Sequence, residues 1–231
     1  MDAKNSQNEL IQFLSQVDMF QNLPVERLAE LVKSSRQHNL PKGAVLFFQD
    51  DPAEAVYVVR SGSVTIVLTN PDGRELVIGE LRTGEAFGEL ALIAGGERSM
   101  NAMIHERCEL LAIPSAVFLH MMNIEPVLMH NLLKITAERL YSSAEREAAL
   151  AFLDAPARLA RTLRHLDHQD PTKGFLTVSQ EELARRTGLT RQTVAKCLGR
   201  WRRQGWLITG RGRIVLLNHA ALEKIELQTP A

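Results

Sequence analysis

The sequence has few of the residues that build metal centres or disulfide frameworks. It contains only two cysteines, Cys108 and Cys197, which lie far apart, and no Cys-x-x-Cys motif or Cys/His grouping. This argues against structural zinc, an iron–sulfur cluster and a disulfide-stapled fold, and it fits a reducing compartment. No apolar run is long enough to span a bilayer, and the N-terminus lacks the layout of a signal peptide. We therefore expect a cytoplasmic protein that binds no metal and contacts no membrane.

Catalytic groupings are also missing. The chain has no activated nucleophile and no pair of carboxylates at a useful spacing, so we expect no catalytic residues, no enzymatic activity and no required cofactor. A nucleotide-processing enzyme such as a hydrolase stays an alternative. Haem is a less favoured one, for which four histidines are available: His38, His105, His120 and His130.

Charged residues are distributed unevenly between the two halves of the chain. The chain has 231 residues, an apolar content of 45% and a formal net charge of zero. Residues 1–154 hold 21 acidic and 13 basic side chains, net −8, whereas residues 155–231 hold 6 acidic and 14 basic ones, net +8. This length accommodates two domains, and the charge asymmetry indicates a nucleic-acid partner for the C-terminal one.

The segment 84–102 has the composition of an anion-binding loop. Arg98 offers a fork of donors for phosphate oxygens, and the Ser99 hydroxyl can complete the cradle. A phosphate would repel the Glu89 carboxylate, so we expect Glu89 to accept from a hydroxyl such as a ribose 2′-OH. Together the groups suggest a nucleotide site. The alternative is an ion pair between Glu89 and Arg98 that merely pins a glycine-rich turn.

Short runs of Val, Ile, Leu and Phe separated by glycine turns fill residues 36–113 and predict a closed or rolled antiparallel sheet. Helices are expected within residues 8–35, broken near Pro24. The expected strands cover residues 44–48, 55–59, 63–69, 75–81, 101–105 and 109–113.

A long helix is predicted from Pro126, a favourable first helical residue, to about Ala151. Residues spaced alternately by four and three form a heptad seam along it, which a second copy of the helix or the protein's own sheet could cover. The break after the helix, near Asp154, marks the domain boundary. The seam consists of Met129, Leu133, Thr136, Leu140, Ser143, Glu147 and Leu150.

Residues 179–203 predict a helix-turn-helix. Ser179 and Thr190 are expected to cap the two helices, and Gly188 permits the turn between them. The second helix has an apolar stripe and an outer face of donors suited to base edges and phosphates. The run 209–217 predicts a basic hairpin, a wing whose Arg211 and Arg213 reach DNA phosphates. The outer face comprises Arg191, Gln192, Lys196, Arg200 and Arg203.

Residues Phe87, Gly88, Glu89, Leu90, Ala91, Arg98 and Ser99 resemble the phosphate-binding cassette of cyclic-nucleotide-binding domains. Met100 departs from that pattern, which usually has Ala, so the nucleotide is left open. With the helix-turn-helix, the chain from about Leu14 to Leu227 resembles the catabolite activator (CRP/FNR) family of bacterial transcription regulators.

The resemblance implies an α+β protein with an N-terminal jelly-roll-like β-roll at residues 1–125, a dimerisation helix at 126–153, and a winged helix-turn-helix at 154–231. It implies a homodimer that binds double-stranded DNA at a pseudo-palindromic operator, with cAMP or a related cyclic nucleotide as effector. RNA polymerase is a further partner in activating relatives, through the loop 167–174.

The resemblance also implies further site residues. In the long helix, Arg139, Ser143 and Ala144 would face the ligand, and Ala144 replaces a Ser found in cAMP-responsive relatives. Arg191, Gln192 and Lys196 fall at base-reading positions. Alternatives keep the fold but change the signal: ligand independence, cyclic di-GMP, another small molecule or redox state. The remaining residues expected at the DNA are Ser179, Gln180, Thr190 and Arg200.

Overall fold

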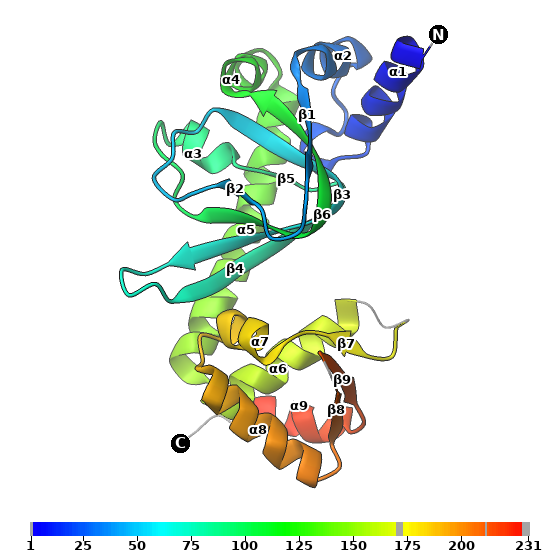
Figure 1. Cartoon of the computed structure of the whole chain (residues 1–231). Coiled ribbons are helices and arrows are strands. Elements are labelled where there is room, and N and C mark those ends of the chain that lie inside the picture. Colours follow the sequence, from blue (N-terminus) through cyan, green and yellow to red (C-terminus); the bar gives the residue numbers. More distant parts are fainter. Residues whose placement is uncertain (1, 170–172, 211, 228–231) are drawn as a thin grey trace. The chain divides into compact units, whose positions relative to one another are not determined.

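The computed structural model describes residues 2–169, 173–210 and 212–227, and for residues 2–5 only the backbone. The chain divides into two compact units, Met1–Leu140 and Tyr141–Ala231. Figure 1 shows a sheet with helices in the first unit and a mainly helical second unit with a small sheet. We describe each unit by itself.

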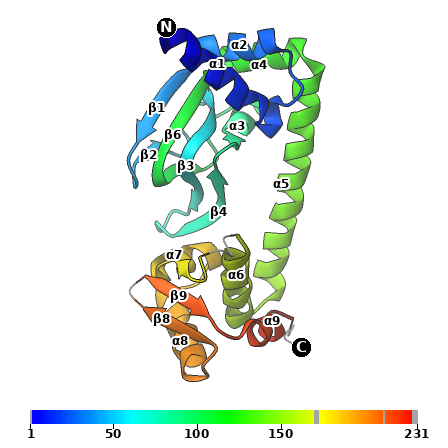
Figure 2. The ribbon, with the colours of Figure 1, turned by 90° about the vertical axis from the view of Figure 1, so that its right-hand side faces the viewer.

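Helices open the first unit: α1 (Asp2–Ser15), the 3-10 helix η1 (Asp18–Phe20) and α2 (Val25–Ser34). The helical region was predicted, but the break within it is longer than expected, because η1 and a left-handed Asn22 (φ 63°) occupy it. Leucines at helical spacing in α1 and α2 are buried. In Figure 2 both helices lie with α4 (Ser115–Ile124) at one end of the sheet.

The sheet of the first unit is antiparallel throughout, as predicted. Its strand order is β1-β6-β3-β4, with β2 paired to β6 and β5 paired to β3. One apolar core fills the space between the sheet and the helices, and a second lies within the roll around residues such as Val64 and Ile104. The strands are β1 (Arg36–Leu40), β2 (Val45–Phe47), β3 (Ala55–Thr69), β4 (Glu75–Arg82), β5 (Ala86–Phe87) and β6 (Asn101–Pro114).

Two details of the sheet differ from the prediction. The segments 55–59 and 63–69 were expected as separate strands but form the single strand β3, and the segments 101–105 and 109–113 likewise form β6. The register between β3 and β6 shifts between Val59 and Val64. Bulges therefore bend two continuous strands where the sequence suggested turns.

The long helix α5 (Pro126–Phe152) begins at the predicted proline and passes from the first unit into the second. In the first unit it is anchored by the buried Leu128 and Leu132 and by Asn131, whose side-chain amide donates to the carbonyl oxygens of Met19 and Gln21. Seam residues on its other side are exposed in the single chain, Met129 to 47%, Leu133 to 69% and Leu140 to 70%.

The second unit has the winged helix-turn-helix order that the sequence predicts. Its core is built around the fully buried Trp201, and its small sheet has the order β7-β9-β8. Among the described residues, no helix has the length and apolarity needed to cross a membrane. The elements are α6 (Ala155–Gln169), β7 (Leu176–Thr177), α7 (Gln180–Thr187), α8 (Arg191–Arg203), β8 (Leu207–Gly210), β9 (Arg213–Leu216) and α9 (His219–Leu227).

Candidate effector and nucleic-acid sites

The loop singled out in the sequence forms a short helix on the sheet. Strand β5 ends at Phe87, and Gly88 turns the chain into α3 (Glu89–Ile93) with a left-handed φ of 88°. A Cβ atom on Gly88 would lie 2.8 Å from the Arg98 Nη1 atom. Glycine is therefore needed at this position both for the backbone conformation and for the close approach of Arg98.

Glu89 is fully buried at the start of α3. Its Oε1 atom accepts a hydrogen bond from Arg139 of α5, whose other terminal nitrogen donates to the Ala86 carbonyl at 2.6 Å. Within the part of the chain that the structure describes, the second oxygen, Oε2, has no hydrogen-bond partner. One carboxylate oxygen thus ties the loop to α5 and the other is left for a donor from outside the chain.

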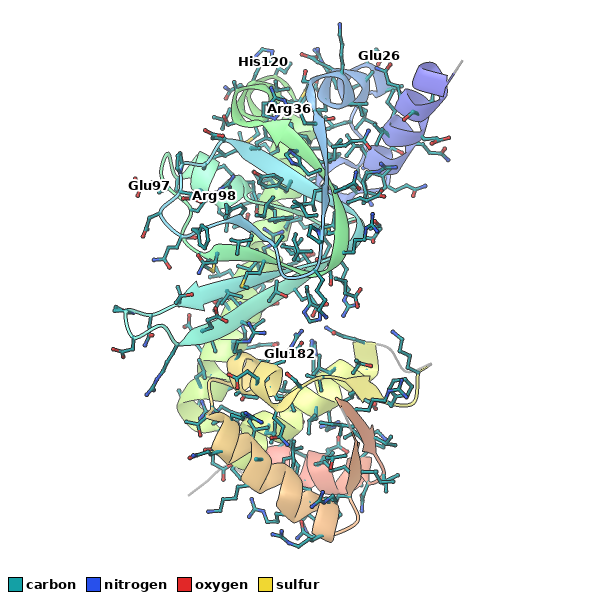
Figure 3. All side chains as sticks on the ribbon, viewed as in Figure 1. Glu26, Arg36, Glu97, Arg98, His120 and Glu182 are labelled. Carbon is teal, nitrogen blue, oxygen red and sulfur yellow. The ribbon has the colours of Figure 1, made fainter. Side chains whose placement is uncertain are left out.

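Arg98 is also buried, with only 3% of its surface exposed. Its guanidinium donates to the carbonyl oxygens of Gly88 at 2.6 Å and Ala55 at 2.7 Å. The ion pair between Glu89 and Arg98 that the sequence left open is therefore wrong, because Glu89 pairs with Arg139 instead. Among the described residues, no carboxylate forms an ion pair with Arg98, and its Nε atom has no partner. Figure 3 shows Arg98 directed toward the strands beside the outward-pointing Glu97.

Two aromatic residues that sequence reasoning missed lie against Arg98. The guanidinium carbon is 4.3 Å from the centre of the Phe47 ring and 5.7 Å from that of Tyr57. Burial lowers the pKa of Arg98, while Tyr57 and Glu89 raise it; burial raises the pKa of Tyr57, which Arg98 opposes. Phe47 and Tyr57 read as ordinary strand residues in the sequence, because only the folded register brings them to the arginine.

Arg139 pairs with Glu89, and Arg98 donates to the carbonyl of the adjacent Gly88, so the three predicted residues lie around the start of α3; their role in ligand binding stays a prediction. Leu90 and Ser99 are exposed at the surface of the same loop, and Met100 is half-buried. Ser143 and Ala144 lie in the stretch of α5 that belongs to the second unit, and their part in the site stays a prediction.

In the second unit the predicted caps are confirmed. The Ser179 hydroxyl accepts from the Glu182 backbone N–H at 3.0 Å, and the Thr190 hydroxyl accepts from the Thr193 N–H at 3.2 Å. Gly188, left-handed with φ 66°, ends α7. These local choices fix the two helices of the motif.

Helix α8 has one buried and one exposed side. Val194, Cys197, Leu198 and Trp201 are buried. The side that faces solvent carries hydrogen-bond donors, which suit the major groove. It presents Arg191, Gln192, Lys196 and Arg200.

A pocket of about 280 Å³ lies between the starts of α7 and α8 and the wing hairpin. Four of the predicted DNA-contacting residues line it: Ser179, Gln180, Arg191 and Arg213. Arg213 is held over the Phe175 ring, 4.7 Å from its centre. Arg211, the other wing arginine of the prediction, lies outside the described residues. Two arginines against one acidic lining residue, Glu181, together with the two helix N-termini make this face suited to DNA phosphates.

A family model matches each of the two units. Residues 37–125 match the model of the cyclic nucleotide-binding domain, and residues 157–225 match that of the Crp-like helix-turn-helix domain. In the described part of the chain, no cluster of three or more His, Cys, Asp or Glu side chains is arranged to hold a metal ion.

Two relatives span almost the whole chain. The cyclic AMP receptor protein of Thermus thermophilus is 32% identical over 207 residues, 90% of this chain and 95% of that protein. The CRP-like cAMP-activated global transcriptional regulator of Mycobacterium tuberculosis is 29% identical, with 90% and 95% covered. The first is named as a receptor for cyclic AMP and the second as a transcriptional regulator.

Among solved structures, the c-di-GMP responsive global regulator CLP of Xanthomonas campestris superposes with a TM-score of 0.77 at 28% identity, covering 84% of this chain and 99% of that one. The β-roll, the long helix and the winged helix-turn-helix thus recur together in a solved structure.

Proposed function

Since the chain belongs to the CRP/FNR family of transcription regulators, we propose that it is a homodimer whose affinity for a specific DNA operator is set by a cyclic nucleotide, cAMP in the first instance. The main support for this proposal is that Arg98 is buried without a carboxylate partner among the described residues. Its guanidinium is 3% exposed and, in the described structure, pairs with no carboxylate. A buried positive charge of this kind is stabilised by an anion, and a phosphate matches its donors.

The neighbouring groups select for a nucleotide. The Glu89 Oε2 atom is buried without a partner in the described chain and can accept from a ribose hydroxyl. The exposed Ser99 hydroxyl can donate to the phosphate. The site therefore combines one group that attracts an anion with one that would repel it, which is what a ribose phosphate requires.

The identity of the effector has two candidates. The Thermus and Mycobacterium relatives are named for cyclic AMP, which favours cAMP. The Xanthomonas regulator is described as responsive to c-di-GMP, and the half-buried Met100 changes the shape of the site, which keeps cyclic di-GMP as the second candidate. Isothermal titration with cAMP, cGMP and cyclic di-GMP separates them. Binding of none at millimolar concentration would support a ligand-independent regulator.

We place the dimer contact along α5. Met129, Leu133 and Leu140 follow the heptad pattern and are exposed in the single chain, and burying such a seam against a second copy is favourable. Leu133→Glu should shift the protein to monomer in analytical ultracentrifugation. An unchanged dimer would remove this helix from the interface. We retain residues 126–153 as the dimerisation segment.

For the DNA complex, Arg191, Gln192 and Lys196 are assigned to base edges in the major groove, and Ser179 and Arg213 to phosphates beside it. Two copies related by the dimer axis would read the half-sites of a pseudo-palindrome. Contact with RNA polymerase through residues 167–174 stays a prediction.

Coupling between the sites runs through α5. The pair between Glu89 and Arg139 joins the start of α3 to α5. A ligand hydroxyl that donates to the Glu89 carboxylate therefore changes the contact that holds α5 in place. Asp154, which accepts from the Ala157 N–H at 2.8 Å and so caps α6, is the proposed hinge to the DNA-binding domain. The effector then shifts the population of arrangements that fit the operator.

A further inference from the structure

The face of the Arg98 guanidinium is covered by an aromatic ring. Its central carbon lies 4.3 Å from the centre of the Phe47 ring, within the distance at which a cation is attracted to an aromatic face. The Tyr57 ring is 5.7 Å away. Phe47 ends β2 and Tyr57 lies in β3, so the two rings reach the arginine from different strands.

The Phe47 ring is itself held in place. It stacks on Tyr57 with the centroids 5.9 Å apart, and Tyr57 stacks on Phe87 at 5.5 Å. Tyr57 and Phe87 are paired directly between β3 and β5. Phe87 immediately precedes the Gly88 turn, so the three stacked rings connect the Phe47 ring beneath Arg98 to the start of the predicted ligand-binding loop.

The remaining contacts of the guanidinium lie in its plane. Nη1 donates to the Gly88 carbonyl and Nη2 to the Ala55 carbonyl, while Nε has no partner in the described chain. Two in-plane bonds and one covered face fix the orientation of the group. The Nε–H, and any N–H group that neither these bonds nor the Tyr57 hydroxyl uses, remains for a ligand.

For a buried arginine that binds an anion, an aromatic ring is a better partner than a carboxylate. The ring quadrupole offsets part of the cost of burying the cation, yet it carries no net charge that would compete with a phosphate. Arg98 can therefore stay buried and still present its full positive charge to an anion.

We propose that Phe47 is a positioning residue for the effector site: its ring holds the guanidinium of Arg98 in the orientation that receives the ligand's phosphate, without neutralising it. This rests on the proposed function, because it assumes that Arg98 binds the phosphate of a nucleotide. Phe47 acts through Arg98 and does not contact the ligand.

The test compares variants with and without a ring at residue 47. Phe47→Leu and Phe47→Met keep an apolar side chain but lose the ring, and both should bind cAMP roughly ten-fold more weakly in isothermal titration, from the value of a desolvated cation–π contact. Phe47→Tyr keeps the ring and should bind within about two-fold of the natural protein. Titrations are made at a temperature below the thermal unfolding midpoint of each variant. Two variants without the ring are used in case one of them fails to fold.

A second arm distinguishes positioning from general packing. In an Arg98→Gln background the cation is gone, so Phe47→Leu should change the residual cAMP affinity by less than about two-fold. An equal loss in both backgrounds would overturn the proposal, as would equal weakening by Phe47→Tyr and Phe47→Leu. If the natural protein binds none of the cyclic nucleotides, the proposed function fails and the positioning role falls with it. If it binds and Phe47→Leu binds equally well, only the positioning role is refuted.

Discussion

The pair between Glu89 and Arg139 should stabilise the first unit even without effector, because it compensates a fully buried carboxylate. The informative change is Arg139→Met, which keeps the length of the side chain and removes the charge. It leaves Glu89 with neither oxygen paired within the described chain, and it also removes the 2.6 Å bond to the Ala86 carbonyl.

The magnitude follows from the burial of the two partners. Breaking a fully buried pair costs about 3–5 kcal/mol, because an uncompensated charge remains. The Arg139 side chain is 34% exposed, so water screens the pair and the expected loss falls to about 2 kcal/mol. The double variant Glu89→Gln/Arg139→Met leaves no buried carboxylate without a cationic partner and should recover at least half of that loss, roughly 1 kcal/mol.

Urea unfolding of the full chain without nucleotide, followed by far-UV circular dichroism, measures these differences. Arg139→Lys is the matched control, since it retains the charge and should lose less than Arg139→Met. If Arg139→Met unfolds within about 0.5 kcal/mol of the natural protein, or if the double variant is as unstable as the single one, the pair does not compensate the buried carboxylate as described.

Three further outcomes are expected. Gly88→Ala should abolish cyclic-nucleotide binding in isothermal titration and destabilise the protein by about 1–3 kcal/mol, because residue 88 has a φ of 88° and a Cβ atom there would clash with Arg98. The control variant Gly96→Ala has open space around the new Cβ atom and should bind normally. Equal effects of the two substitutions would refute the argument. Burial raises the pKa of the Cys108 thiol to about 11, so Cys108 in the native protein should react only slowly with iodoacetamide at pH 8. Stability should fall as the pH rises above the thiol's ordinary value, where only the unfolded state loses the proton. Fast labelling of Cys108 in the folded protein would contradict this. Arg191→Ala should weaken specific DNA binding by about 1–3 kcal/mol and relax selection at one base pair in a binding-site selection, whereas uniform weakening on all sequences would make Arg191 a phosphate contact.

Local sequence signals predicted much of this molecule. The caps at Ser179 and Thr190 and the left-handed Gly188 depend on neighbouring residues only, and the structure has all three. The pairing of Glu89 with Arg139 joins residues fifty positions apart. Local patterns had left open an ion pair between Glu89 and Arg98 instead. That pair does not form, because the fold brings Arg139 of α5 to Glu89 and directs Arg98 toward two carbonyl oxygens.

Other features could not be read from local patterns. The continuous strands β3 and β6 were divided in the prediction, since a bulge and a turn leave similar glycine and serine signals in a sequence. Phe47 and Tyr57 belong to strands whose alternation predicts burial and nothing more. Only the pairing of β5 with β3 and the placement of β2 on β6 bring their rings to Arg98.

The central claim is that a cyclic nucleotide held by Arg98 controls DNA binding by this chain. It is tested most directly by fluorescence anisotropy on a labelled operator, selected from random DNA in the presence of cAMP, with and without saturating cAMP. The account predicts an affinity increase of about ten-fold or more for the natural protein, within the usual range of allosteric coupling, and none for Arg98→Gln. Equal affinity of the natural protein with and without cAMP, or an undiminished response in Arg98→Gln, would contradict it.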